Sequence, residues 1–174
     1  MATIVPVGDL QPQQPAFLAP NASLVGDVRF GVDCSVWFGA VLRGDINYVE
    51  LKDRANVQDN CVLHVSKKLP CIIGARTSLG HGAIAHACVV GEDCLLGMNC
   101  CVLDGAEIGD GCLIAAGCVV PEGMVVPPNH LVAGIPGRAI KPLRAETAER
   151  VRRINGDYVA YQQLYPQILA EAQA

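Results

Sequence analysis

The stretch VGEDCLLGMNCCVLDGAEIGDGCLIAAGCVV, residues 90–120, decides the fold because it repeats every six residues. A large aliphatic residue heads each unit, and a small residue stands four places later. The heads are Val90, Leu96, Val102, Ile108 and Ile114, and the small residues are Cys94, Cys100, Ala106, Cys112 and Cys118. A period of six fits neither an α-helix nor a two-sided strand. It is typical of a triangular solenoid, in which each unit supplies one short strand and one corner.

The same pattern extends toward the N-terminus, with interruptions at 46–50 and in a loop at 65–72. Its heads there are Leu24, Phe30, Val36, Leu42, Val57, Leu63, Ile73 and Leu79. Three units make one coil of about 18 residues, and coils stack at about 4.8 Å. Heads and small residues both point into the prism. This hexapeptide pattern resembles the left-handed parallel β-helix family, and the left hand is taken from that resemblance.

The cysteines follow the repeat. The chain has nine, an odd number, and its start shows no secretion signal, so we do not expect a disulfide framework. Six occupy the inward small position, namely Cys34, Cys61, Cys94, Cys100, Cys112 and Cys118. Cys88 joins them after a one-residue slip near residue 85, whereas Cys71 and Cys101 lie off the pattern. Free cysteine packs as a small hydrophobe, so we expect core filling.

The domain organisation changes after residue 142. Residues 1–142 are expected to form the β-helix with its N-terminal lead-in, and 143–174 a C-terminal α-helix. Its apolar stripe is predicted to comprise Val151, Ile154, Tyr158, Tyr161, Tyr165 and Ile168. Gly156 weakens this helix, and Pro166 is expected to end or kink it. The stripe predicts packing along the outside of the β-helix or on a neighbouring subunit.

The composition excludes several classes of function. A chain of 174 residues with a net charge of −4 predicts one domain without the basic footprint needed for nucleic acid or an anionic membrane. The longest apolar stretches, such as 113–120, are far too short to span a bilayer. A cytoplasmic protein is the expectation.

Three of the four histidines, His64, His81 and His86, lie within 23 residues. Residues about 18 apart stack in such a solenoid, which predicts that His64 lies approximately over His81. Five extended residues separate His81 from His86, roughly 16 Å at most, which places them near different edges. One subunit would struggle to bring both to one zinc ion at 2.0–2.1 Å, whereas a three-fold oligomer can. Three histidines leave a tetrahedral position open, which is typical of catalytic zinc. His130 is expected to be structural.

Four segments then resemble the gamma-class carbonic anhydrase-like family, and the likeness runs from about residue 10 into the C-terminal helix. They are AVLRGD (40–45), NVQDNCVLH (56–64), LGHGAIAH (79–86) and LGMNCCVLDGAEIG (96–109). The resemblance implies a homotrimer with zinc, or iron or cobalt, between subunits. His64 and His86 would come from one subunit and His81 from the next.

The resemblance also assigns roles around the metal. Arg43 and Asp59 match residues that pair across the trimer contact. Asp45 and Asn56 match polar residues that support the site, and Gln58 matches the residue that hydrogen-bonds the metal's water. The implied reaction is the attack of hydroxide on CO2 to give bicarbonate.

The sequence departs from fully active members of that family at two places. Their glutamate after the aspartate is replaced by Ile46, and the loop 65–72 carries no acid. Fast CO2 hydration needs a group that carries the proton away, so slow turnover is expected unless Tyr158 or a buffer substitutes.

Two other classes stay open. AGIPGRAIK (133–141) also resembles the last coil of hexapeptide acyltransferases, for which a thioesterase using metal hydroxide is a chemical variant. The third alternative is a non-catalytic trimeric scaffold held together by the metal.

Overall fold

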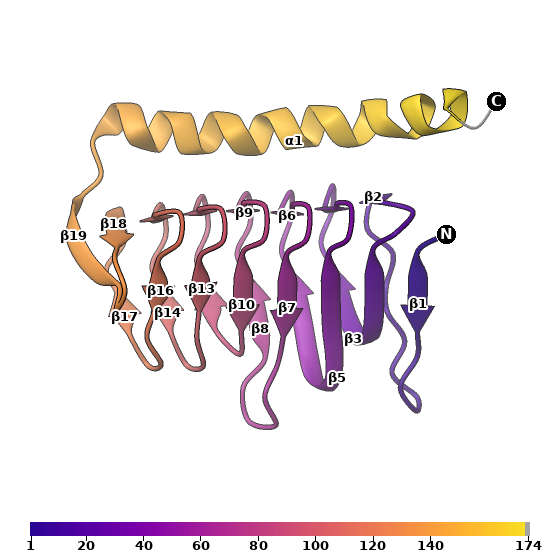
Figure 1. The fold of residues 1–174 in the computed structure, drawn as a ribbon, viewed down its shortest axis with the longest axis horizontal. Helices are drawn as coiled ribbons and strands as arrows, with labels where there is room; N and C mark the ends of the chain where they lie inside the picture. Colours follow the sequence, from indigo (N-terminus) through magenta and orange to yellow (C-terminus); the bar gives the residue numbers. More distant parts are fainter. Residues whose placement is uncertain (173–174) are drawn as a thin grey trace.

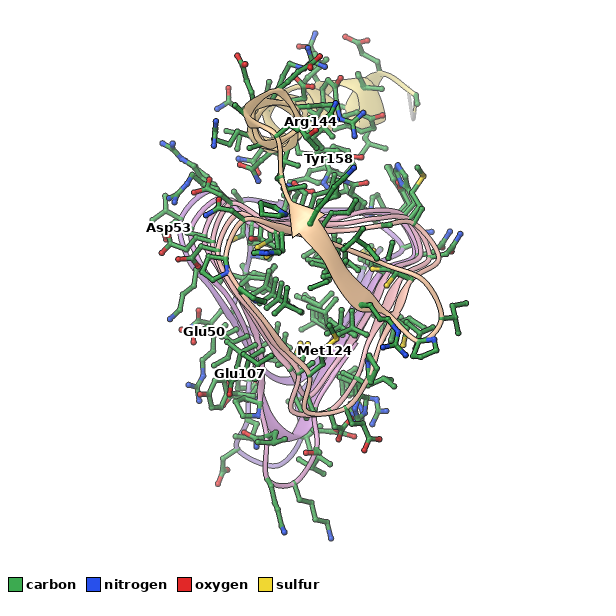
Figure 2. The ribbon with its side chains drawn as sticks, turned by 90° about the vertical axis from the view of Figure 1, so that its left-hand side faces the viewer. Glu50, Asp53, Glu107, Met124, Arg144 and Tyr158 are labelled. Atoms are coloured by element: carbon green, nitrogen blue, oxygen red, sulfur yellow. The ribbon has the colours of Figure 1, made fainter. Side chains whose placement is uncertain are left out.

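The computed structural model describes residues 1–172 and shows a β-helix of about seven coils with one long helix along its outside (Figure 1). The left-handed parallel β-helix expected from the hexapeptide pattern is confirmed. Seen end-on, the coils outline a triangular prism whose interior is filled by side chains (Figure 2). Short strands stacked in three rows form its three faces, and the functional residues discussed below lie at the corners between rows.

Hydrogen bonds between coils define the rows. The first row contains β3 (Ser23–Phe30), β5 (Val41–Leu51), β7 (Val62–His64), β10 (Ile84–His86), β13 (Cys101–Val102) and β16 (Val119–Val120). The second contains the C-terminal part of β5, then β8 (Cys71–Ile73), β11 (Val89–Val90), β14 (Glu107–Ile108) and β17 (Val125–Val126). The first strand of the chain, β1 (Thr3–Val5), pairs with β3. The third contains β2 (Phe17–Leu18), β4 (Ser35–Val36), β6 (Asn56–Val57), β9 (Ser78–Leu79), β12 (Leu95–Leu96), β15 (Leu113–Ile114), β18 (His130–Ala133) and β19 (Arg138–Pro142).

Side chains alternate along each strand, and this alternation builds the core. In β7, Leu63 is fully buried, whereas its neighbour Val62 is 38% exposed on the outer surface. The heads predicted from the repeat all lie in the core, although Phe30 is only partly buried. The six-residue period is therefore the spacing at which the chain returns a large side chain to the interior.

The cysteines behave as the repeat predicts. All nine are free, and eight are buried, including Cys71, which the pattern left open. Cys101 is the exception, because it lies at an outward position of β13 and is partly exposed. Burial raises the pKa of Cys34 to about 11 and that of Cys61 to about 12. These thiols stay protonated at neutral pH, which makes them inert filling rather than redox groups.

Two coils contain extra residues. The expected interruption at 46–50 is part of one continuous strand, β5, which bends round a corner. Val28 follows Gly26 by two positions, whereas Val49 follows Gly44 by five, so this coil holds three more residues. The second insertion is the loop 65–70 between β7 and β8, shorter than the expected 65–72 because β8 already begins at Cys71. Both insertions leave the corner at the end of the first row.

Gly44 shows how closely the coils approach at that corner. A Cβ atom on Gly44 would lie 2.2 Å from the backbone oxygen of Asp27, closer than any real Cβ contact. Only glycine fits there, because every other residue would push the neighbouring coil away. The close contact fixes the positions of Arg43 and Asp45 on either side.

The helix α1 (Ala145–Glu171) lies along the third row. It continues through Pro166, so the expected end of the helix there is wrong. Its buried side is lined by Val151, Asn155, Tyr158, Gln162, Tyr165 and Leu169. Tyr161 and Ile168, which the sequence placed on the apolar stripe, are 45% and 42% exposed. The stripe was misplaced because two polar residues occupy core-facing positions.

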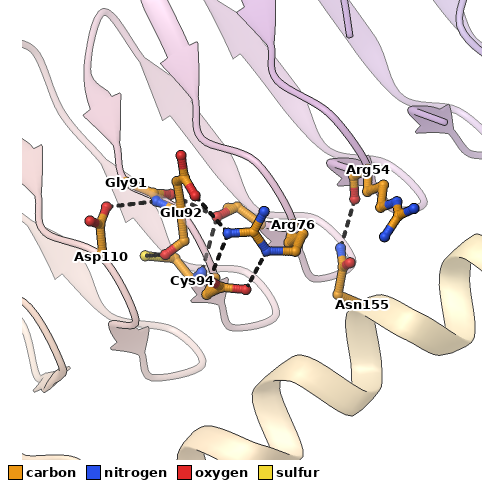
Figure 3. A network of polar contacts seen from close by, with 9 residues as sticks. Arg54, Arg76, Gly91, Glu92, Cys94, Asp110 and Asn155 are labelled. Carbon is orange, nitrogen blue, oxygen red and sulfur yellow. Dashed lines mark hydrogen bonds and ion pairs between the residues drawn. The ribbon is translucent and has the colours of Figure 1, made fainter. Parts of the chain in front are cut away.

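Contacts of α1 with the solenoid are specific. The rings of Tyr158 and Tyr165 pack edge-on against Trp37, with centroids 5.1 and 4.8 Å away. Asn155 donates a hydrogen bond of 2.8 Å to the backbone oxygen of Arg54, at the corner drawn in Figure 3. The helix therefore has both an apolar anchor and a polar one, which fix its position over the third row.

The corner between the second and third rows is held by charged side chains (Figure 3). Arg76 donates to Asp93 at 2.8 Å and to Glu92 at 2.6 Å, and Asp110 accepts from the backbone nitrogen of Glu92. Such exposed pairs contribute modestly to stability, so their main effect is to keep the coils in register. In residues 1–172, no helix has the length and apolar character that crossing a membrane requires.

Candidate metal centre

The inserted loop decides which histidines meet. Because it adds four residues to an 18-residue coil, His86 lies 22 residues after His64 and pairs with it in register across β7 and β10. The predicted stacking of His64 over His81 is wrong for the same reason, since the loop lengthens this coil and carries His81 to a different corner. The structure instead joins the two histidines at the end of the first row.

The residues at that corner form what we call the end-corner group: Asp45, His64, His86 and Asp104. His64 Nε2 lies 3.0 Å from Asp45 Oδ1, and His86 Nδ1 contacts Asp104 Oδ1. The other two ring nitrogens, His64 Nδ1 and His86 Nε2, face each other at 3.0 Å. Each imidazole is therefore held by a carboxylate on one side and presents its second nitrogen to its neighbour.

That arrangement fits a metal ion. Two nitrogens sharing a tetrahedral zinc at 2.0–2.1 Å would lie about 3.3 Å apart, close to the separation found. Metal-binding histidines commonly donate their other N–H to a carboxylate, which fixes the tautomer and the ring. The donor set of the end-corner group has this character. It offers two of the three expected ligands, the pair that the resemblance assigns to one subunit.

Asp104 was missed by the sequence analysis. It follows His86 by 18 residues, the length of one regular coil, so the repeat itself contained the signal. Adding one coil to each histidine would have placed this carboxylate beside His86.

The third histidine belongs to the start-corner group, which comprises Asn56, Gln58, Asp59, His81 and Tyr158. His81 Nδ1 lies 2.7 Å from Asp59 Oδ2. The Gln58 amide nitrogen donates to Asn56 at 3.2 Å, and Asn56 donates to Ser78 at 2.8 Å. The solenoid residues of this group lie where the third row ends and the first begins, and Tyr158 belongs to α1. His81, like the other two histidines, therefore has one nitrogen held by a carboxylate.

A hollow of about 250 Å³ opens beside this group. It is lined by Gln58, Gly80, His81, Leu95, Gly97, Met98, Ile154 and Tyr158. Tyr158 reaches it from α1, and Figure 2 shows this side chain between the helix and the prism. Burial raises the pKa of Tyr158 well above its usual value, so its phenol stays protonated at neutral pH. Tyr158 can donate a hydrogen bond there but cannot accept the proton of a reaction.

The two groups lie at opposite ends of the first-row strands. Five residues lead from His81 at the start corner to His86 at the end corner, and β10 lies between them. Within residues 1–172 of one chain, no group of three or more histidine, cysteine, aspartate or glutamate side chains is placed to hold a metal ion. A three-histidine site thus requires the end corner of one copy and the start corner of another.

Arg43 and Asp59 also lie at different corners of the prism, Arg43 at the end corner and Asp59 at the start corner. Arg43 donates to Asp45 at 2.5 Å, whereas Asp59 contacts His81, so the two do not pair within one chain. Partial burial opposes ionisation of Asp45, but hydrogen bonds from His64 and Arg43 outweigh it and lower the pKa of Asp45. Their pairing across subunits stays a prediction.

The positions that depart from the family pattern are exposed beside the end corner. Ile46 follows Asp45 and is 49% exposed. The loop 65–70 presents Lys67 and Lys68 to solvent and packs Leu69 near Gly105. No carboxylate stands in this loop, so Asp45 and Asp104, both already engaged with histidines, are the acids of this corner.

Comparisons with known proteins agree with this fold. Residues 87–122 match the family model described as bacterial transferase hexapeptide (six repeats). The chain is 48% identical, over 84% of its length and 91% of the relative's, to a probable carbonic anhydrase of Methanocaldococcus jannaschii. It is 39% identical to a carbonic anhydrase of Geobacillus kaustophilus, over 86% of this chain and 82% of that one.

Among solved structures, a putative acetyltransferase of Bacillus cereus superposes with a TM-score of 0.93. It is 39% identical, and the match covers 96% of this chain and 98% of that one. The fold and the corner histidines define a hexapeptide-repeat β-helix protein. Within that class, the chain belongs to the gamma-class carbonic anhydrase-like family.

Proposed function

We propose that the protein is a metal-dependent carbonic anhydrase-like lyase that converts CO2 to bicarbonate reversibly as a homotrimer. His64 and His86 of one subunit and His81 of the next would hold the metal, with zinc the first candidate and iron or cobalt the others. The observation that carries the proposal is the pair of ring nitrogens that face each other at 3.0 Å, each imidazole being backed by a carboxylate. This pair lacks one ligand, which the start corner offers.

The outer surface of the first row supports the assembly. Its first outward positions are apolar and lie in register from coil to coil: Val41, Val62, Ile84, Cys101 and Val119. Val62 and Ile84 are 38% and 39% exposed. This apolar column lies between the two corner groups, on the face that a neighbouring copy must approach to join them. A head-to-tail contact of this kind closes into a three-membered ring when each copy is rotated by a third of a turn from the last.

When bound, a metal of this class lowers the pKa of its water ligand and supplies hydroxide near neutral pH. The chain's own residues orient the polar groups on the side of the site that would receive the substrate. The Gln58 amide nitrogen is engaged by Asn56, so its carbonyl oxygen is the acceptor turned to other partners. Asn56 is in turn held by Ser78, which leaves this amide little freedom to rotate. The apolar lining of the neighbouring hollow suits CO2, which has no net dipole.

Removal of the proton is the weak step. Ile46 and the acid-free loop 65–70 supply no titratable acceptor, and the Tyr158 phenol stays neutral. Turnover is therefore expected to depend on the concentration of external buffer.

The test uses two variants that each destroy one half of the site. His64→Ala subunits and His81→Ala subunits carry different affinity tags, and mixed trimers are purified by both tags in turn. In any mixed ring, one interface pairs the intact end corner of a His81→Ala subunit with the intact start corner of a His64→Ala subunit. Metal analysis should give about one ion per mixed trimer, against about three in wild type and none in either pure variant.

The other outcomes show which part of the proposal is wrong. Mixed trimers without metal would show that all three histidines act within one chain. Metal content unchanged in pure His81→Ala would refute the site itself. With the site established, stopped-flow CO2 hydration of the zinc-loaded and metal-free protein decides the activity. A hydration rate equal to background would mean that the metal only holds the subunits together. Removing the metal should then dissociate the trimer.

Transfer or hydrolysis of acyl groups is the second candidate, favoured by the putative acetyltransferase whose structure superposes. A thioesterase would use the same metal site on acyl-CoA. Calorimetric titration with CoA separates the two, because a carbonic anhydrase has no use for CoA. Binding of CoA would favour the acyl function, and its absence would remove it.

A further inference from the structure

Asp104 is the acid of the end corner that the resemblance to the family does not assign. Its Oδ1 contacts Nδ1 of His86, while the other ring nitrogen, Nε2, faces His64. The side chains of His86 and Asp104 are 34% and 36% exposed, so they are partly screened by solvent and partly enclosed by the corner. The contact is made by the ring nitrogen two bonds away from the one that would reach the metal.

The fold holds Asp104 rigidly in this place. β13 pairs with β10, with Val102 beside Ala85, so His86 and Asp104 follow at the same corner of adjacent coils, where their side chains meet. The next backbone nitrogen, that of Gly105, donates 2.8 Å to the oxygen of Ala87, and the oxygen of Asp104 accepts from Gly123 at 2.9 Å. Its backbone is thus tied to the coil below and the coil above, and the carboxylate cannot drift from the imidazole.

We infer that Asp104 is a positioning residue that sets the tautomer of His86. By accepting the proton of Nδ1, it leaves the lone pair of His86 on Nε2, aimed at the nitrogen of His64. This role rests on the proposed metal site. It acts through His86, because Asp104 itself does not face the nitrogen pair. With this role for Asp104, each histidine of the end corner has its ring fixed by its own acid, Asp45 for His64 and Asp104 for His86.

The experiment measures Co²⁺ affinity of the trimer by competition with a chelator, alongside the visible absorption spectrum of bound Co²⁺. Asp104→Ala removes the acceptor, whereas Asp104→Asn keeps an oxygen in place of the carboxylate. Glu122→Gln is the matched control, since Glu122 lies one coil beyond Asp104 and is exposed. His86→Ala reports loss of the ligand itself. Size and circular dichroism show that each variant assembles.

Asp104→Ala should weaken Co²⁺ binding about 10- to 100-fold and alter the absorption bands, the usual cost of losing such a partner. Asp104→Asn should recover part of the affinity, and Glu122→Gln should match wild type. Equal affinity for Asp104→Ala and wild type would overturn the role of Asp104 while leaving the metal site intact. Equal weakening by Glu122→Gln would overturn it too, because only overall charge would then matter. If wild type and His86→Ala bind Co²⁺ alike, the proposed function fails, and this role with it.

Discussion

The end corner and the start corner of the first row differ in how complete they are within one chain. The end corner brings His64 and His86 together at 3.0 Å, each with its own acid. The start corner holds His81 on Asp59, beside a hollow and an oriented amide, but has no second histidine. A solenoid stacks residues one coil apart along an edge, but it cannot bring two edges of the same prism together. Ligands on one edge are preorganised by folding, and those on two edges require assembly.

The largest effect that tests this division is expected at Gln58. If Gln58 orients the reacting water and does not bind the metal, Gln58→Ala should lower kcat for CO2 hydration about 100-fold, the cost of misplacing a reactant. Metal content should stay at the wild-type level. Stopped-flow rates and metal analysis on the same sample check this. Loss of metal in Gln58→Ala would instead mean that Gln58 itself helps to hold the ion.

A second test disturbs the end corner through its backbone. Gly44→Ala places a Cβ atom against the Asp27 oxygen, so it should destabilise the protein by about 2 kcal/mol. Because Arg43 and Asp45 flank it, metal affinity should fall as well. Denaturation in urea and the chelator competition measure the two effects. Gly123→Ala, where open space surrounds the added atom but φ is +64°, controls for backbone strain alone.

A third test adds the acid that the end corner lacks. Ile46 is 49% exposed, so Ile46→Glu should fold normally. A carboxylate there can accept the proton, and kcat at low buffer concentration should rise about tenfold. Ile46→Gln, which has the same shape without the charge, should give no gain. An equal gain from both variants would show that polarity rather than proton transfer limits the rate.

The smallest effect concerns the surface between the corners. Cys101 stands in the apolar column of the first row and is the one partly exposed thiol among nine. In the trimer it should react with iodoacetamide several-fold more slowly than in chains dissociated by dilution, because the neighbouring copy covers this face. Mass spectrometry of labelled peptides gives the rates. Fast alkylation of Cys101 in the intact trimer would place the subunit contact on another face.

The sequence predicts most of the fold because every inward position obeys one period. It predicts Leu63 and Cys61 in the core for the same reason that it predicts Ile114. It fails where residues are inserted, since the four extra residues in the loop after His64 shift the count and exchange His81 for His86 as the partner of His64. It also fails on α1, where Asn155 and Gln162 face the solenoid despite their polarity. Asp104 was within reach of the repeat, but no periodic signal marks where one chain ends and its neighbour begins.

The loop 65–70 leaves the prism at a corner and returns to the next strand in register. Its length is therefore decoupled from the geometry of the histidines, because the backbone hydrogen bonds between β7 and β10 set their separation. Lengthening such a loop costs little free energy, as closure entropy grows only slowly with the number of residues. Relatives can thus insert or delete residues between the first and third histidines without moving either. A search for this site that fixes the spacing of its histidines along the chain would overlook them, whereas one that counts whole coils would not.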